Sequence, residues 1–450
     1  MSRLRERLQR LRKSQQQSTA QPEAGQEAAA QPRIDSTQST AWDLPGTVWC
    51  ENEYGRFIKK TCTYPLDYKH GLFRLGELSS GVPGMHLSAK PHASRFQLEQ
   101  IRSDQLLFLD TETTGLGSGT GNVPFMIGIA WKEANCFRIE QLFIRNPAEE
   151  AAMLHHLQEK LANFKAIVTY NGRSFDWPLI KSRYIMHRMR LQEPEAHIDL
   201  LHPSRSLWQT TLASCRLGEV EAQRLHFQRV DDISGSLAPT LYFQYLQEQN
   251  PLLVAGIFKH NEWDLLSLAA LTIYFSQLLS GRLPWQQMMS FEELIRCGYW
   301  LDRLGCSELA EEAMSFAYEN IDRAETISQL VELAAWHKKK QRWDSAVKLW
   351  KMACSTEADH ECDASHAAPK LVNVDTLIEL AKYYEHRSKN IEEALTYALL
   401  AREQVRMRMS WSRWNRKYAK LEQEIQARIA RLQRKKKKSN HAQSMTFYFD

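Results

Sequence analysis

A run of large apolar residues, Leu106 to Leu109, leads directly into two carboxylates in the sequence LLFLDTETTG. A short apolar run of this kind predicts a buried strand. Residues two apart on a strand point to the same face, so Asp110 and Glu112 are expected to converge. Neighbouring carboxylates repel each other unless cations neutralise them, which favours an ion that prefers oxygen ligands, Mg²⁺ or Mn²⁺. The alternative is a polar strand end with two solvated acids.

A second apolar run ends in a carboxylate in the same way. The predicted strand from Ala166 to Tyr170 continues into NGRSFDWP, which places Asp176 at the start of a helix. A carboxylate is favoured there as a helix cap, so capping is the alternative to metal binding. Asn171 is equally suited to a turn, and Phe175 to packing in the core.

The third element, HNEWD, lies in an apolar-periodic helix expected over residues 252–279. His260 and Asp264 are four residues apart and therefore lie on one helix face. A histidine titrates near neutrality and can accept a proton from water. Alone, such a histidine is more often a surface or core residue, so its meaning here depends on the two upstream carboxylate elements.

The segment around these elements reads as an α/β domain. Strands are expected over 124–131 and 137–144, and a helix over 147–164. This order predicts a mixed sheet with helices packed on it. Before it, residues 45–100 are expected to form a small β-rich lead-in with a hairpin near Gly55. Residues 1–44 are poor in large apolar side chains and are expected to be a disordered tail.

After Pro284 the pattern becomes wholly helical. Alanines stand beside aromatic residues, as in LAAW at 333–336 and LAKY at 380–383. Such spacing lets antiparallel helices pack closely and predicts an all-α helical-repeat domain of the tetratricopeptide (TPR-like) type over 288–430. A plain helical bundle is the alternative. The basic run RLQRKKKK opens an expected tail over 431–450, either solvated or in contact with phosphates.

Length and composition set broader limits. A chain of 450 residues is expected to form two or three domains, and a net charge of +5 does not by itself indicate nucleic-acid binding. Eight dispersed cysteines, no apolar run of spanning length and no apolar secretory segment predict a cytoplasmic protein without a membrane partner. The spacing of Cys354, His360, Cys362 and His366 matches no usual zinc pattern, so a zinc site is a minor alternative.

Taken in order, the three elements resemble the Exo I, Exo II and Exo III motifs of the DEDD 3′→5′ exonuclease superfamily. The DTETTG segment is similar to that of proofreading exonucleases, and NGRSFD resembles the second motif of family B polymerase exonuclease domains. With its helical C-terminal part, the chain resembles the YprB-type RNase H-like proteins of bacteria. The nuclease resemblance covers residues 101–282 and implies an RNase H-like DEDD exonuclease domain there; the YprB-type resemblance covers most of the chain.

The resemblance also implies roles for individual residues. It implies a 3′→5′ exonuclease that hydrolyses phosphodiester bonds of nucleic acid with two Mg²⁺ or Mn²⁺ ions, acting on the 3′ end of single strands. The four acids would hold the ions, and the histidine would take the proton from the attacking water. The implied catalytic residues are Asp110, Glu112, Asp176, His260 and Asp264. The implied substrate-binding residues are Thr111, Thr113, Leu116, Asn171 and Phe175.

One departure leaves the role of the histidine open. In the His-type branch of the superfamily the histidine stands five positions before the last aspartate, and in the Tyr-type branch a tyrosine stands four positions before it. Here His260 takes the tyrosine spacing relative to Asp264. The runner-up hypothesis is therefore a catalytically weak or inactive nucleic-acid-binding adaptor whose helical repeats recruit a protein partner. An endonuclease on the same site is a third option, and no motif distinguishes RNA from DNA.

Further polar residues lie between the second and third elements. The sequence IDLLHP places Asp199 and His202 at a strand end, either as structural support or near the site. Three arginines that follow are candidates for phosphate contacts: Arg205, Arg216 and Arg224. The segment DDISG at 231–235 resembles a further segment of YprB-type proteins, and no role for it follows from the sequence.

Overall fold

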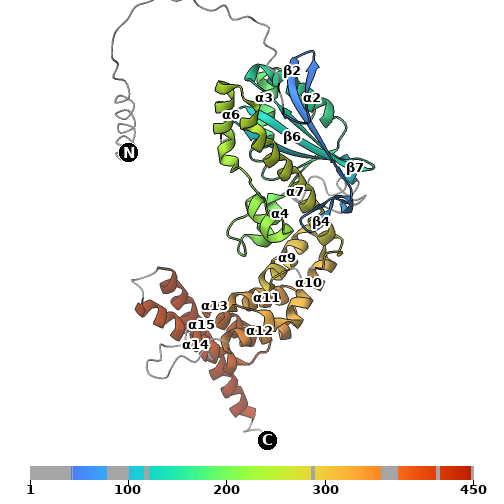
Figure 1. Ribbon diagram of the computed structural model, residues 1–450. Coiled ribbons are helices and arrows are strands. Elements are labelled where there is room, and N and C mark those ends of the chain that lie inside the picture. Colours follow the sequence, from blue (N-terminus) through green and yellow to red (C-terminus); the bar gives the residue numbers. More distant parts are fainter. Residues whose placement is uncertain are drawn as a thin grey trace, which may run out of the picture. The chain divides into compact units, whose positions relative to one another are not determined.

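A seven-stranded mixed sheet dominates the first half of the structure, a computed structural model that describes residues 42, 44–78, 101–115, 121–284, 289–355, 373–411 and 416–446 (Figure 1). The strands follow the order β1-β2-β7-β6-β5-β8-β9. β5, β8 and β9 are parallel, and the other neighbours are antiparallel. The strands are β1 (Thr47–Asn52), β2 (Gly55–Pro65), β5 (Leu106–Thr113), β6 (Pro124–Lys132), β7 (Cys136–Phe143), β8 (Ala166–Thr169) and β9 (Ala196–Asp199). A separate pair is formed by β3 (Lys69–His70) and β4 (Phe73–Arg74).

The hairpin expected near Gly55 is present as β1 and β2. Asn52 pairs with Gly55 across the turn, and Gly55 has φ +123°, which glycine adopts without steric cost. β2 also pairs along its length with β7. The segment predicted as a lead-in therefore contributes two strands to the main sheet.

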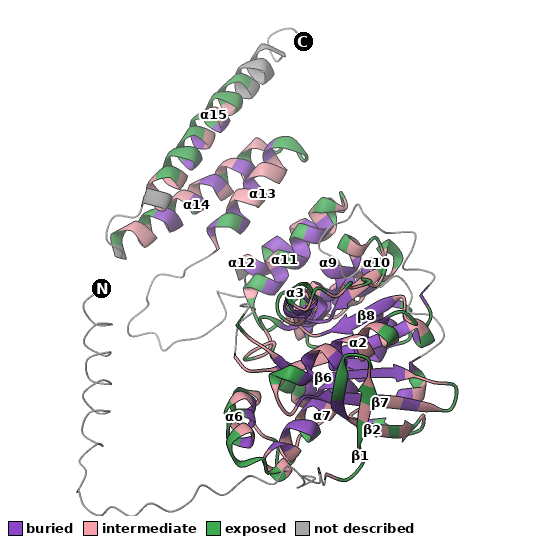
Figure 2. Ribbon diagram, turned by 90° about the horizontal axis from the view of Figure 1, so that it is seen from above, coloured by how far each residue is buried: buried purple, intermediate pink, exposed green. Residues whose placement is uncertain are grey.

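Helices cover both faces of this sheet. β6 is buried along its whole length except at Lys132. On β2, Phe57 meets His156 of α2, whereas Lys60 meets Glu262 of α7; residues of opposite parity on a strand point to opposite faces. Figure 2 shows the buried residues gathered on the sheet and on the helices that face it. The helices of this part are α2 (Glu150–Leu161), α3 (Asp176–Met186), α4 (Leu201–Trp208), α5 (Leu217–Val220), α6 (Ala238–Glu248) and α7 (Ala255–Leu279).

The parallel strands end at one edge of the sheet. Leu106 of β5 is in register with Ala166 of β8, which is in register with Ala196 of β9. The carboxyl ends of the three strands therefore lie side by side, which is where ligands bind in open sheets of this kind.

Short 3-10 or π turns are η1 (Leu75–Glu77), η3 (Ser103–Gln105), η4 (Pro147–Glu149), η5 (Glu221–Leu225), η6 (Gly235–Leu237), η7 (Pro251–Val254) and η8 (Ile321–Arg323).

The described residues after 289 are helical, as predicted. Ser290 and Glu293 form a capping box that starts the first of these helices, and Gly305 (φ +83°) ends it. The basic run that begins at Arg431 continues the last helix. Among the described residues, no helix combines the length and the apolar character needed to cross a bilayer. The helices are α9 (Phe291–Leu304), α10 (Ser307–Glu319), α11 (Ile327–Lys339), α12 (Trp343–Ser355), α13 (Val374–His386), α14 (Ile391–Trp411) and α15 (Arg416–Thr446).

Candidate active site

The first predicted element lies on β5. Asp110 Oδ2 accepts a hydrogen bond of 2.8 Å from Asn261 Nδ2 of α7. Gly128 of β6 stands opposite Asp110 in the sheet, and a Cβ at this glycine would lie 2.1 Å from Asn261 Oδ1. A glycine within a strand often marks such a close approach. The missing side chain at Gly128 therefore allows α7 to bring Asn261 onto Asp110.

The second predicted element follows β8 and is built around a buried carboxylate. Asp199, 1% exposed, accepts backbone N–H bonds from Asn171 (2.7 Å) and Arg173 (3.2 Å). Asn171 adopts a left-handed φ of +64°. This turn starts α3 at Asp176, whose carboxylate accepts a hydrogen bond from the Thr111 hydroxyl of β5. Asp199 thus supports the turn that delivers Asp176 to the end of β5.

The third predicted element lies on α7 and faces the first. His260 Nε2 is 3.4 Å from Asp264 Oδ2. One ligand atom from each of Glu112, His260 and Asp264 lies within 4.8 Å of the others. Glu262, between them in sequence, instead contacts Lys60 on β2. The helical spacing therefore directs His260 and Asp264 toward Glu112 of β5, and Glu262 toward Lys60 of β2.

The carboxylates of the three elements repel one another. Burial, followed by repulsion from Asp264 and Asp176, raises the pKa of both Asp110 and Glu112 well above their ordinary values. Burial also raises the pKa of Asp176 to about 6, although the hydrogen bond from Thr111 opposes this shift. Acids that are buried together and repel one another need protons or cations to be stable together.

Comparisons with known proteins agree with this architecture. A family model described as the RNase_H superfamily matches residues 107–276. The chain is 32% identical to the uncharacterized protein YprB of Bacillus subtilis (strain 168) over 386 residues. This match covers 82% of the present chain and 87% of YprB. The chain belongs to the YprB family. The RNase H-like domain of this YprB-family chain suggests a nuclease that binds nucleic acid and uses divalent metal ions.

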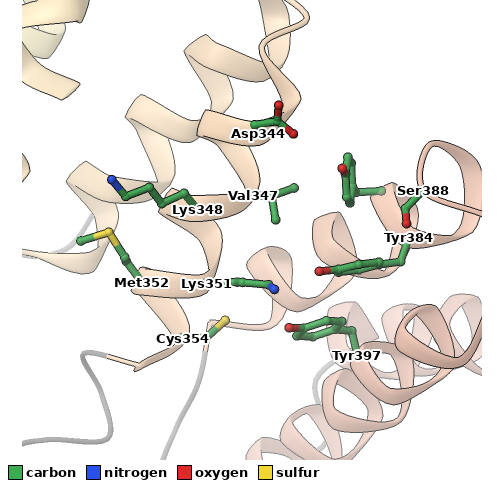
Figure 3. Close-up of a pocket in the computed structure, with 10 residues that line it drawn as sticks. Asp344, Val347, Lys348, Lys351, Met352, Cys354, Tyr384, Ser388 and Tyr397 are labelled. Carbon is green, nitrogen blue, oxygen red and sulfur yellow. The ribbon is translucent and has the colours of Figure 1, made fainter. Parts of the chain in front are cut away.

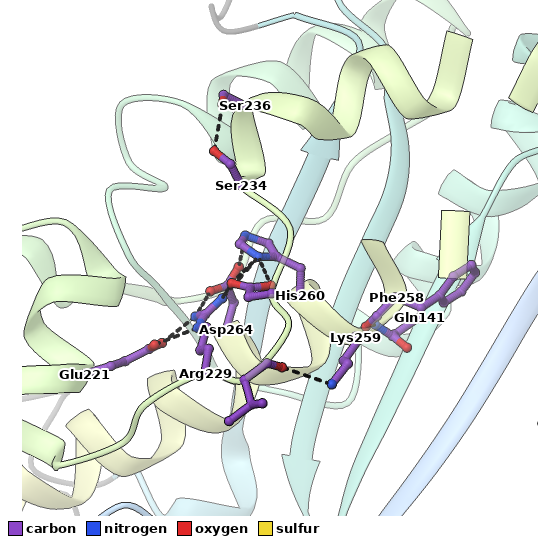
Figure 4. Close-up of polar contacts among 11 residues, drawn as sticks. Gln141, Glu221, Arg229, Ser234, Ser236, Phe258, Lys259, His260 and Asp264 are labelled. Atoms are coloured by element: carbon purple, nitrogen blue, oxygen red, sulfur yellow. Dashed lines mark hydrogen bonds and ion pairs between the residues drawn. The ribbon is translucent and has the colours of Figure 1, made fainter. Parts of the chain in front are cut away.

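An arginine that sequence analysis missed sits among the acids of this YprB-family chain. The side chain of Arg229 is only 10% exposed and forms ion pairs with Glu221, Asp232 and Asp264 (Figure 4). Its Nε is 2.7 Å from Glu221 Oε2. These contacts raise the pKa of the guanidinium further, against the effect of burial. Arg229 thus places a fixed positive charge among the acids of the site.

A second missed residue orients the histidine. His260 Nδ1 lies 2.8 Å and 2.9 Å from the two carboxylate oxygens of Asp232. Arg229 Nη1, which can only donate, also lies 3.2 Å from Nδ1. The two carboxylate contacts are shorter and favour the tautomer with the proton on Nδ1, which leaves the lone pair on Nε2, the nitrogen that faces Asp264. The only sequence signal was the DDISG segment, whose role could not be derived from sequence.

The predicted substrate-binding residues are placed differently from one another. Phe175 is 46% exposed next to Asp176 and is not a core residue. Thr111 bonds Asp176, and the Thr113 hydroxyl donates to Gly115 O at 2.7 Å. Leu116 lies outside the described residues.

The minor candidates are resolved only in part. Arg224 is paired with Glu293 of α9, whereas Arg205 and Arg216 are exposed. Of the four zinc candidates only Cys354, on α12, is described; the other three lie outside the described residues.

A hollow of about 780 Å³ opens between α12, α13 and α14 (Figure 3). Lysines and tyrosines line much of it, among them Lys348, Lys351, Tyr384 and Tyr397. No residue predicted for catalysis or substrate binding is part of its lining. The hollow is therefore a feature of the helical region and not of the carboxylate cluster.

Proposed function

We propose that this chain is a metal-dependent 3′→5′ exonuclease that hydrolyses single-stranded nucleic acid, with Asp110, Glu112, Asp176 and Asp264 as metal ligands. The observation that carries the proposal is geometric: β5, α3 and α7 bring these acids together, with ligand atoms of Glu112 and Asp264 within 4.8 Å of each other and Asp176 bonded to Thr111, the residue after Asp110. A cluster of mutually repelling acids that serves only the fold would be costly, because buried charges need compensation. Its place at the carboxyl ends of the parallel strands supports a ligand-binding role.

The donor set fits divalent cations. Carboxylate oxygens are the ligands that Mg²⁺ and Mn²⁺ prefer. Bound there, such ions would supply Lewis-acid stabilisation of a phosphoryl oxygen and activation of a water molecule. We propose two ions, in keeping with the DEDD arrangement of the motifs.

The other residues of the site have supporting roles in this proposal. Asn261 fixes the Asp110 carboxylate, and Thr111 fixes that of Asp176. The exposed ring of Phe175, next to Asp176, offers a surface on which a terminal base can stack. Thr113 and Asn171 shape the loops around the end of the substrate strand.

The test uses the full chain, freed of metal and then supplied with Mn²⁺ or Mg²⁺. Matched RNA and DNA single strands carrying a 5′ label should shorten in a ladder from the 3′ end, and a blocked 3′ end should prevent this. Asp110→Asn should reduce shortening to background, whereas Asp231→Asn, at an exposed aspartate, should not. Internal cuts would favour an endonuclease, and equal shortening by Asp110→Asn would refute the assigned site.

One observation favours a second candidate, the non-enzymatic adaptor. Arg229 already pairs with Asp264, so a protein cation compensates part of the acidic cluster. An adaptor would bind strands without degrading them and would use its helical region, proposed as TPR-like, to recruit a partner. Retention of labelled strands by both the wild type and Asp110→Asn, with no shortening in any metal, would decide for this candidate.

A further inference from the structure

His260 shares a helix face with a proposed metal ligand. Successive residues of an α-helix are turned by about 100°, so a side chain four positions before Asp264 points nearly the same way as Asp264. A side chain five positions before it would be turned away by about a further 100°. The separation of 3.4 Å between His260 Nε2 and Asp264 Oδ2 reflects this alignment.

That separation is one that two ligands of a single ion adopt. Atoms bonded to one ion at about 2.1 Å cannot be more than about 4.2 Å apart. The Nε2–Oδ2 distance of 3.4 Å meets this limit. One ligand atom from each of Glu112, His260 and Asp264 lies within 4.8 Å of the other two, so a contraction of about 0.6 Å at most would complete a three-ligand set.

The imidazole is also prepared for coordination. Asp264 has its Oδ1 on Arg229 and its Oδ2 toward His260. The contacts between Asp232 and Nδ1, which are shorter than the 3.2 Å contact of Nδ1 with Arg229, favour the tautomer with the Nε2 lone pair directed at the site. Histidines that ligate metals generally donate their other ring N–H to a carboxylate in this way.

We propose that His260 Nε2 is itself a ligand, with Glu112 and Asp264, to one divalent ion, and that it biases this position toward a first-row transition ion over Mg²⁺. The inference rests on the proposed function and deepens it, because it names the ion class and replaces the role of proton acceptor for His260. Imidazole nitrogen binds first-row transition ions well, whereas Mg²⁺ is bound almost wholly by oxygen. Asp232 is the positioning residue that holds the ring.

The experiment measures metal binding without substrate. The full chain is freed of metal, labelled with ¹⁵N-histidine and titrated with Mn²⁺, and the bound ion is followed by electron paramagnetic resonance. We expect a nitrogen hyperfine coupling in the wild type that is absent in His260→Gln, together with a loss of Mn²⁺ affinity of at least about tenfold. The affinity for Mg²⁺, measured by competition, should change by less than about threefold. Asp232→Asn should weaken Mn²⁺ binding by about 10–100-fold, as removal of such a partner does, and Asp232→Glu should restore part of it.

Each outcome decides a separate question. Bound Mn²⁺ without a histidine coupling in the wild type overturns the inference even if the variants fail to fold. His260→Gln that keeps its Mn²⁺ affinity but loses turnover overturns it too, and returns His260 to the role of base while the proposed function stands. A histidine hyperfine coupling in a protein that degrades no strand supports the metal site and overturns the proposed exonuclease activity.

Discussion

Replacing Gly128 with alanine should lower the stability of the sheet around the site by about 3–5 kcal/mol. The added Cβ would lie 2.1 Å from Asn261 Oδ1, and ordinary contact begins at 3.4 Å, so the amide has to move by about 1.3 Å. Overpacking of a buried site costs about 1–3 kcal/mol. The displaced amide would also strain its bonds to Asp110 (2.8 Å) and from Gln141 (2.9 Å), each worth about 1 kcal/mol.

Hydrogen exchange measured by mass spectrometry on peptides from β5 and β6 reports this local stability. A loss of 3 kcal/mol corresponds to a protection factor reduced by more than about 100-fold. Gly218→Ala is the matched control, because no atom lies within 4 Å of a Cβ in that position and alanine favours a helix there.

A double variant isolates the contact. In the double variant Gly128→Ala, Asn261→Ala, the amide that would clash with the new methyl group is absent. The double variant should therefore be more stable than Gly128→Ala alone. Two results would refute the claim that the missing side chain at Gly128 makes room for Asn261. One is a hydrogen-exchange protection factor in Gly128→Ala within a factor of two of the wild type; the other is that the effects of the two substitutions on stability add.

Two further predictions concern buried carboxylates. The hydrogen bond from Arg431, with further cationic contacts, lowers the pKa of Glu385 from an ordinary 4.5 to about 2. The ion pairs of Glu385 therefore stabilise α15 above about pH 4.5, and this stabilisation is lost as the pH falls toward 2. Glu385→Gln should therefore speed hydrogen exchange of α15 at pH 7 and flatten its acid transition, whereas Glu403→Gln, at an exposed position on α14, should do neither; unchanged exchange in Glu385→Gln would contradict this. Asp199→Asn should cost about 2 kcal/mol in thermal unfolding, because one carboxylate serves three backbone N–H groups, and a Tm equal to that of the Asp231→Asn control would disprove it.

Local sequence patterns were sufficient for the elements that carry the acids. The apolar run before Asp110 is a strand, Asp176 begins a helix, and Asp264 lies on the long helix, all as predicted. Each of these follows from the hydrophobicity of neighbouring residues, which is a short-range property. The hairpin near Gly55 was equally visible, but its pairing with β7 depends on residues far away in the chain.

The charges that complete the site could not be found in this way. Arg229 and Asp232 lie in a connection between η5 and α6 with no periodic pattern, and Arg229 is 35 residues from its partner Asp264. Their role depends on the folded structure, in which Arg229 contacts Asp264 and Asp232 contacts His260, both on α7. Asn261 stood within the third motif, yet its role needed the opposing glycine on β6.

The Arg229 guanidinium among the acids affects the stability of the metal-free protein. A fold whose negative charges had only metal for compensation would come apart on chelation. Here Arg229 pairs with Asp264 and Glu221 inside the folded chain, so we expect the chain to fold before it binds the proposed ions. Occupancy then becomes a reversible equilibrium set by the ions around the protein, separate from the question of whether the protein is folded.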